Sequence, residues 1–504
     1  MEARSEGKLH KALSSLTRRA IHVIGPSGTE GSAVIDFLLS RGITTITAHD
    51  LAAATEQFAE TFHRTHQWLA PAEREAALAH LLASPVGIRF RDQYLAGIED
   101  ADLIVVPQSW FRYPENAPLQ ALRARGVPFT SMTRLFFETC PCPIIGVTGT
   151  NGKFTVATLI FQMLQEAGRT VFISGNDRTH VPMLYYLDRI TPDAWLVLEI
   201  SNRQLLDLDH SPHVGVVTNL APHHLDDHGT MEAYARVKAT LISHQDSDDH
   251  AVLNRDNPYT REMDAQTRAQ ISWFSAEGAV ERGVYVEGDT LRLAGDGAVA
   301  AVIPVRDLPV PGRSMVENAL AACAAARAAG VTPEAMAAVL RRFRGLPYRF
   351  SYVGEIGGIA FYEDSLATNP TAAAAAIQSL TRSFLLIAGG LRRGATPDDF
   401  RPMVDALFAS GLCKAVLLIG STAAVLSDAL AAIPPGRRPA VLMARTLEGA
   451  MAEARRLAVA GDAVLLSPGC ESLDQFADYR ERGDRFRALA EEFAPAGSKL
   501  EPTE

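Results

Sequence analysis

The sequence has few cysteines, few aromatic residues and no long apolar run. Its five cysteines are odd in number and scattered over 504 residues, so they indicate no disulfide framework. No apolar run reaches the roughly 18–20 residues that a membrane-spanning helix needs. Residues 1–20 carry charges throughout and have no apolar core, which argues against a secretory signal. We therefore expect a cytoplasmic protein that does not insert into a membrane.

An excess of positive charge is also absent. The chain has 48 Lys and Arg against 58 Asp and Glu, a formal net charge of -10. Nucleic acid and anionic membranes repel such a chain, which argues against both as partners and leaves small-molecule substrates. Hydrophobic residues make up 47% of the chain, enough for sizeable cores. At ~100–200 residues per domain, the length predicts about three domains.

Apolar runs alternate with helical patterns in three successive blocks. The first contains AIHVIG, GPSGTEG, SAVIDFLLSRG and ITTITAHD, which is typical of a strand, a glycine turn, a helix and a strand. The second begins with PIIGVTG and continues through FTVATLIFQMLQEAG, AWLVLEIS and VGVVTNLAP. The third contains SFLLIAGG, AVLLIGS and AVLLSPG. We predict an α/β protein with Rossmann-like domains over residues 1–140 and 346–504 and a central parallel-sheet domain over 141–345.

A glycine-rich loop joins the first strand and helix of the second block. It consists of Gly149, Thr150, Asn151, Gly152 and Lys153. Backbone N–H groups in such a loop bind phosphate oxygens at a helix N-terminus, and the lysine adds a full positive charge. A plain turn would not need the lysine, so the central domain is predicted to be of the P-loop ATPase type. Phe154 stands where such loops normally carry a Mg²⁺-binding hydroxyl. The next residue, Thr155, is turned ~100° further around the helix.

A polar segment at residues 219–238 reads NLAPHHLDDHGTMEAYARVK. Its His224 and His228 are four apart, as in a zinc pair on a helix. The aspartates between them and the glycine that follows favour a loop instead, which would cap a helix that starts near Thr230. That helix contains Lys238, and a single helical lysine is usually a solvated charge.

Six motifs in series resemble the Mur ligase family. In chain order they are TGTNGK, LEISNRQL, NLAPHHLDDHGTMEAYARVK, GLPYRF, EDSLATN and LLSPGCESLDQFADYRERGDRF. The SLDQF string narrows the resemblance to the MurD branch, UDP-N-acetylmuramoyl-L-alanine:D-glutamate ligase. This branch implies an ATP-dependent amide ligase of peptidoglycan precursor synthesis that works through an acyl phosphate. The three domains would then bind the UDP-sugar, ATP and the amino acid in chain order.

The resemblance also implies roles for individual residues, with ATP and Mg²⁺ as cofactors and a monomeric protein. The implied catalytic residues are Lys153, Glu199, His224 and Lys238. Of these, Glu199, His224 and a carbamylated Lys238 would bind the metal. The implied ATP-binding residues are Gly149, Thr150, Asn151, Gly152, Lys153, Thr155, Asn318, Arg349 and Asp364. The implied substrate-binding residues are Thr29, Asp50, Asn176, Ser201, Thr368, Arg393, Ser472 and Tyr479.

Several positions depart from the family pattern. Phe154, Met315 and Leu366 replace polar residues, and Glu30 adds a negative charge to the turn that would face the UDP diphosphate. The stretch from residue 51 to 100 is longer than usual, and we expect it to decorate the surface rather than to form a lid. Two alternatives follow from these departures. One is a ligase that uses L-glutamate or another carboxylate acceptor. The other is a catalytically degenerate Mur-like protein that binds nucleotide.

Overall fold

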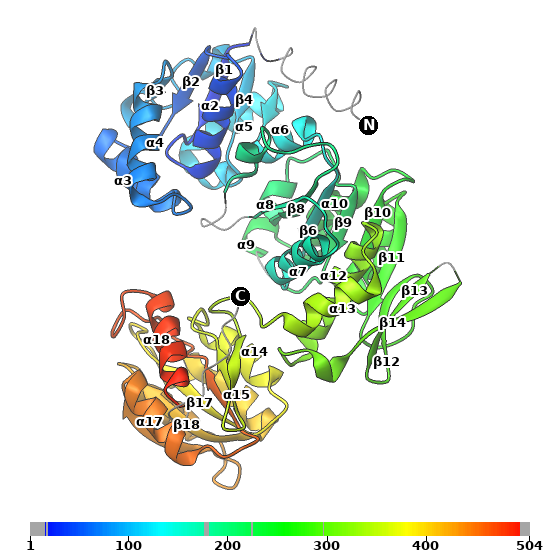
Figure 1. Ribbon diagram of the computed structural model, residues 1–504. Helices are drawn as coiled ribbons and strands as arrows, with labels where there is room; N and C mark the ends of the chain where they lie inside the picture. Colours follow the sequence, from blue (N-terminus) through cyan, green and yellow to red (C-terminus); the bar gives the residue numbers. More distant parts are fainter. Residues whose placement is uncertain (1–15, 17–18, 176–180, 223–224, 296, 494–504) are drawn as a thin grey trace. The chain divides into compact units, whose positions relative to one another are not determined.

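The computed structural model describes residue 16 and residues 19–175, 181–222, 225–295 and 297–493 (Figure 1). Its internal contacts divide the chain into two compact units. The first unit contains the chain up to Val302 and the segment Asn318–Val339. The second contains Ile303–Glu317 and the chain from Leu340 onward.

The first sheet has five strands in the order β3-β2-β1-β4-β5, and its neighbouring strands are parallel. The central strand, β1, is buried at every residue, as expected when helices cover both faces of a parallel sheet. The strands are β1 (Ile21–Ile24), β2 (Ile46–His49), β3 (Gly87–Arg89), β4 (Leu103–Val105) and β5 (Phe129–Thr130). The helices are α2 (Thr29–Ser40), α3 (Thr55–Thr65), α4 (Pro71–Ala83), α5 (Ala117–Ala124) and α6 (Met132–Thr139).

The second sheet has nine strands in the order β14-β13-β12-β11-β10-β9-β6-β8-β7. It is parallel from β7 to β12, and β13 pairs with β12 in the antiparallel direction. Its strands are β6 (Ile144–Thr148), β7 (Val171–Ser174), β8 (Trp195–Glu199), β9 (Val214–Val217), β10 (His250–Asn254), β11 (Gln270–Ser275), β12 (Gly283–Glu287), β13 (Thr290–Gly295) and β14 (Ala298–Pro304). Its helices are α7 (Lys153–Glu166), α8 (Asn202–Leu205), α9 (Leu225–His228), α10 (Met231–Ser243), α11 (Pro258–Arg261), α12 (Arg313–Ala328) and α13 (Pro333–Arg342).

The third sheet has six strands in the order β15-β16-β20-β17-β18-β19. Only the pair β15 and β16 is antiparallel among its described pairs. The strands are β15 (Ser351–Ile356), β16 (Ile359–Glu363), β17 (Phe384–Gly389), β18 (Cys413–Ile419), β19 (Ala440–Arg445) and β20 (Ala463–Leu466). The helices are α14 (Pro370–Ser379), α15 (Arg401–Ser410), α16 (Ala423–Leu430), α17 (Leu447–Leu457) and α18 (Tyr479–Glu491).

Three sheets flanked by helices confirm the predicted α/β class. The predicted helix after Thr230 is also confirmed, because α10 starts at Met231 and the Thr230 hydroxyl caps it. The loop expected just before it is wrong at residues 225–228, where the chain forms the short helix α9. None of the described helices is long and apolar enough to cross a membrane.

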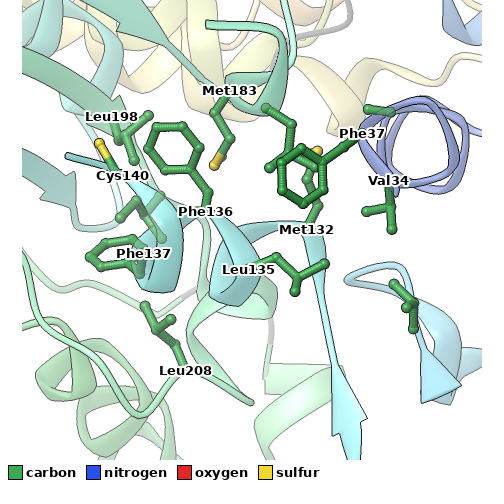
Figure 2. Close-up of a cluster of buried hydrophobic side chains, with 14 of the residues drawn as sticks. Val34, Phe37, Met132, Leu135, Phe136, Phe137, Cys140, Met183, Leu198 and Leu208 are labelled. Atoms are coloured by element: carbon green, nitrogen blue, oxygen red, sulfur yellow. The ribbon is translucent and has the colours of Figure 1, made fainter. Parts of the chain in front are cut away.

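Helix α6 joins the first two sheets into one hydrophobic core. Figure 2 shows its side chains with Val34 and Phe37 of α2 on one side and Leu198 of β8 on the other. Phe136 is fully buried at this junction, and Met183, Leu198 and Leu208 belong to the same cluster. Because one apolar cluster spans both sheets, the first unit is expected to behave as a single packed body.

Candidate active site

The glycine-rich loop connects β6 to α7 and has a backbone shape that requires glycine. Gly149 and Gly152 have φ angles of 143° and 80°, in the region that side chains strain. A Cβ atom at Gly152 would lie 2.1 Å from Asn318 Oδ1. The side chain of Asn318, on α12, therefore lies directly against the loop.

Asn219, which follows β9, accepts hydrogen bonds from the backbone of the loop. Thr150 N donates to Asn219 O over 2.8 Å, and Asn151 N donates to Asn219 Oδ1 over 3.0 Å. Lys153 Nζ donates to the carbonyl oxygens of Gly149 and Thr150 at 3.1 and 3.0 Å. The ammonium group thus lies over the loop, where it can exchange these carbonyls for phosphate oxygens.

A cavity of about 230 Å³ opens beside the loop and collects side chains from distant parts of the chain. Lys153 and Thr150 come from the loop, Glu199 from the end of β8, and Lys238 from α10. The residues that line it are Gln108, Gly149, Thr150, Lys153, Glu199, Ser201, Asn202, Arg203, Tyr234 and Lys238. Ser201 is thus placed at this cavity, where it also caps α8 by accepting from Gln204 N.

Lys238 is buried rather than solvated, with 1% of its surface exposed. Its Nζ donates to Thr148 Oγ1 over 2.9 Å, and this hydroxyl donates to Ile200 O. Burial and the charge of Lys153 lower the pKa of Lys238 well below its usual value, while Glu199 opposes the shift. The expectation of a solvated charge is therefore wrong. A buried lysine with a low pKa has access to its neutral, nucleophilic form.

The segment before α10 directs its described polar side chains toward neighbouring protein groups. Asp227 accepts from Arg203 at 2.8 and 2.9 Å and lies 3.4 Å from Arg112 Nε. His228 Nε2 is 2.8 Å from Asn202 Nδ2. No group of three or more metal-ligating side chains occurs in the described ranges. His224, the implied metal ligand, lies outside the described residues.

Phe154 and Thr155 lie in the first turn of α7 and are both partly buried. Neither is among the residues that line the 230 Å³ cavity, so the Phe154 ring does not fill it. The carboxylate available to a cation there is Glu199. Mg²⁺ is commonly bound by one or two carboxylates together with phosphate oxygens and water. The described donors therefore fit Mg²⁺ held between Glu199 and bound phosphates, without a hydroxyl at position 154.

A second cavity, of about 740 Å³, lies at the carboxyl ends of β1 and β2 and includes the implied substrate residues Thr29 and Asp50. The two Asp50 oxygens accept from Ser27 N at 3.0 Å and Ala52 N at 2.9 Å. Thr29 Oγ1 donates to Thr65 O over 2.8 Å. The cavity stands where Rossmann-like domains bind nucleotides.

Glu30 lines this larger cavity, but its charge is moderated. Its carboxylate accepts from Gln108 N over 2.7 Å, and burial raises its pKa to about 7. The carboxyl is therefore partly protonated near neutral pH. Gln108 also lines the smaller cavity and accepts from Ser201 Oγ over 2.7 Å. The two cavities adjoin at Gln108.

The long stretch after Asp50 is not surface decoration. Gln57, Thr61 and Arg64 of α3 line the 740 Å³ cavity, together with Thr65 and Arg91. The expectation of decoration is thus wrong, because α3 forms one wall of the cavity. Asn176, another implied substrate residue, lies outside the described residues.

In the second unit, Asp364 organises the turn that carries Arg349. Asp364 accepts from Phe350 N at 3.0 Å and from Ser467 Oγ at 2.7 Å, and burial raises its pKa to about 7. Tyr348 and Phe350 have φ angles of 63° and 43°, so the exposed Arg349 sits in a strained turn. Asp364 and Arg349 are thereby brought close together.

The residues that the resemblance implies for the amino-acid pocket lie on loops of the same unit or, for Tyr479, at the start of a helix. Tyr479 begins α18, and its ring centroid is 5.7 Å from that of Tyr348. Ser472 is buried, and its carbonyl accepts from Gln475 N and Phe476 N. Thr368 follows β16, and Arg393 is exposed after β17.

Two regions of the chain match domains of a known protein family. Residues 147–326 match the Mur ligase middle domain, and residues 348–470 match the Mur ligase, glutamate ligase domain. The chain is 35% identical over 485 residues to UDP-N-acetylmuramoylalanine--D-glutamate ligase of Pelotomaculum thermopropionicum, which covers 95% of this chain and 98% of the relative. It is 34% identical over 467 residues to the protein of that name from Symbiobacterium thermophilum, at 92% and 96% coverage. The chain belongs to the Mur ligase family.

The fold of this Mur ligase is similar to a solved family structure. UDP-N-acetylmuramoylalanyl-D-glutamyl-2,6-diaminopimelate--D-alanyl-D-alanyl ligase from Acinetobacter baumannii aligns with a TM-score of 0.53 and 18% identity. The alignment covers 71% of this chain and 78% of that chain. At this identity the likeness supports the three-domain α/β fold.

The sequence did not single out Arg482, which organises the second unit of this Mur ligase. Its guanidinium is 1% exposed and donates to Ser365 Oγ and O and to Cys470 O, each at 2.9–3.0 Å. It thus joins the EDSLATN and LLSPGCES loops, which carry Thr368 and Ser472. Its position inside the last family motif is the only sequence signal for it. Asp478 caps the following helix by accepting from Arg480 N and Glu481 N.

Proposed function

We propose that this Mur ligase adds D-glutamate to UDP-N-acetylmuramoyl-L-alanine, with ATP hydrolysed to ADP and phosphate, in peptidoglycan precursor synthesis. Relatives named for this activity align over nearly the whole chain. The observation that carries the proposal is the cavity shared by Lys153, Glu199 and Lys238, which adjoins the nucleotide-sized cavity at Gln108. A substrate with its nucleotide in the larger cavity can extend its carboxylate toward the ATP loop.

The chemistry needs this arrangement because a carboxylate is a poor acylating agent. One carboxylate oxygen attacks the γ-phosphorus of ATP, the bond to the β-phosphate oxygen breaks, and ADP leaves. The glutamate amine then attacks the acyl carbon of the acyl phosphate, loses a proton, and inorganic phosphate departs. Lys153 and the loop N–H groups are positioned to stabilise charge on the transferred phosphoryl group.

Glu199 is proposed to hold Mg²⁺ against the ATP phosphates, with His224 as a further ligand. Bound Mg²⁺ supplies positive charge beside the transferring phosphoryl group. Position 154 needs no hydroxyl in this arrangement, since the carboxylate and the phosphates provide oxygen ligands.

Lys238 is proposed to carry a carbamate. Its neutral amine attacks the carbon of CO₂, an N–H proton is lost to solvent, and a carboxylate-like anion results. The low pKa of Lys238 supports this step, because only the neutral amine is nucleophilic. The carbamate would lie near Lys153 and would offer Mg²⁺ a second anionic oxygen ligand.

The remaining implied residues are proposed to bind the other ligands. Asn318, against the glycine loop, and Arg349 with Asp364 would contact ATP. Thr155, in the first turn of α7, would lie near the ATP phosphates. Thr29, Asp50, Asn176 and Ser201 would bind the UDP-sugar, and Thr368, Arg393, Ser472 and Tyr479 would form the amino-acid pocket.

The test is phosphate release with ATP, Mg²⁺ and UDP-N-acetylmuramoyl-L-alanine, comparing D- and L-glutamate. We expect release that depends on every component and on D-glutamate, with mass spectrometry detecting the amide product. Release with L-glutamate but not with D-glutamate would mean that the enzyme adds the L-enantiomer instead. No release with either, while ATP still binds, would favour a nucleotide-binding protein without turnover.

A further inference from the structure

Helix α3 presents one polar stripe to the 740 Å³ cavity. Gln57, Thr61 and Arg64 are spaced by four and three residues, which places them on one face of the helix, and all three line the cavity. Phe58 and Phe62, one position further along, are buried in the core of the first unit. The helix is thus oriented by its apolar face, with its polar face directed to the cavity.

The C-terminal end of α3 is fastened to the glycine turn at the start of α2. Thr65 Oγ1 donates to Ser27 O over 2.9 Å, and Thr29 Oγ1 donates to Thr65 O over 2.8 Å. His66 Nδ1 donates to Phe62 O, so its Nε2 accepts from Ser32 Oγ over 2.7 Å. These bonds place the residue before Thr65, Arg64, beside the N-terminus of α2.

Two acidic residues of the cavity, Asp50 and Glu30, are occupied by backbone N–H groups, whereas Arg64 is available. The Asp50 oxygens accept from Ser27 N and Ala52 N, and Glu30 accepts from Gln108 N. Among the described residues, Arg64 has neither an ion pair nor a side-chain hydrogen bond, and it is exposed. Arg91, the other arginine of the cavity, is instead anchored through Nε to Leu51 O at 3.1 Å.

We propose that Arg64 binds the diphosphate of the nucleotide-sugar substrate and is a specificity-determining residue carried by α3. The inference rests on the proposed function, which supplies the UDP-sugar. Backbone N–H groups at the start of α2 offer only a partial positive charge to a diphosphate. An arginine adds a full charge and paired N–H donors with the geometry that phosphate requires.

The experiment compares binding of UDP and of uridine to the full chain by calorimetry. Arg64→Met keeps the apolar stem and removes the charge, and it should weaken UDP binding by about tenfold while leaving uridine binding unchanged. Arg64→Lys should restore part of the UDP affinity. Arg125→Met is the matched control, because Arg125 is an exposed arginine of the same sheet domain that does not line the cavity. It should bind both ligands like the unmodified protein.

Turnover separates a binding role from a structural one. Arg64→Met should raise the KM for the UDP-sugar by a similar factor, with kcat and the KM for ATP unchanged. Unchanged UDP affinity in Arg64→Met, with normal turnover in the unmodified protein, would overturn the inference and leave the proposed function intact. Equal losses for UDP and uridine would also overturn it, since they would mean that α3 had moved. An unmodified protein that neither binds UDP nor turns over would refute both.

Discussion

At the scale of single residues, burial changes what a side chain can do. Lys238 loses its solvent and gains Lys153 as a neighbour, so its amine loses protons far more readily than an exposed lysine. Glu30 and Asp364 shift in the opposite direction, each to a pKa of about 7, because burial disfavours their anions. These shifts mark the groups whose charge depends on their surroundings.

Replacing Lys238 with Ala should abolish phosphate release. The carbamate and its metal-binding oxygens would be lost together, and short-chain carboxylates should restore part of the activity by entering the space left behind. Arg236→Ala on the same helix is the control, because Arg236 is exposed. A Lys238→Ala variant with full activity would exclude Lys238 from the mechanism.

At the scale of elements, α3 depends on one histidine for its position. His66 is 1% exposed, stacks on Phe62 at 3.6 Å between ring centroids, and bonds to Ser32. Burial lowers its pKa to about 4, so the folded protein holds it neutral. Between about pH 4 and its ordinary value of 6.5, the unfolded chain binds a proton that the folded chain does not. The contribution of His66 to stability is therefore complete above pH 6.5 and is lost as the pH falls toward 4.

His66→Ala should destabilise the protein at pH 7.5 by roughly 1–3 kcal/mol, since it removes a buried hydrogen bond and a ring contact. The difference in free energy of unfolding between the two proteins should be smaller at pH 5 by on the order of 1–2 kcal/mol, because only the unmodified protein contains this titrating histidine. Denaturant unfolding at the two pH values measures both quantities. A stability difference that does not change with pH would contradict a neutral, buried His66.

At the scale of the whole molecule, the first unit unites two sheets that the chain builds separately. Helix α6 places Phe136 in a cluster that contains residues of both α2 and β8. The two cavities, which adjoin at Gln108, therefore belong to one packed body. All four tryptophans, Trp68, Trp110, Trp195 and Trp273, lie in this unit.

Tryptophan fluorescence should therefore report one thermal transition for the first unit, and UDP should raise its midpoint. At a UDP concentration of 100 Kd, linkage adds about 2.7 kcal/mol of stability. Far-ultraviolet circular dichroism, which sees both units, provides the comparison. Two separate tryptophan transitions would show that the two sheets unfold independently and that α6 does not join them.

The sequence by itself determined the elements and the phosphate loop. Buried strands such as AIHVIG and PIIGVTG are recognisable because parallel strands need apolar residues on both faces. The loop is recognisable because Gly149, Gly152 and Lys153 lie within five consecutive residues, between an apolar strand and a helical pattern. The strands β13 and β14 carried no comparable signal, since strands that are buried on one side only lack a continuous apolar run.

Only the tertiary structure decided the burial of Lys238, the role of α3 as a cavity wall and the protonation of Glu30. Each depends on parts of the chain that are distant in sequence. Lys238 donates to Thr148, Thr65 donates to Ser27, and Glu30 is partly protonated because the folded chain buries it. Local spacing encodes helices and strands because their periods are local. Burial and pKa are properties of the surroundings, and these exist only after the chain has folded.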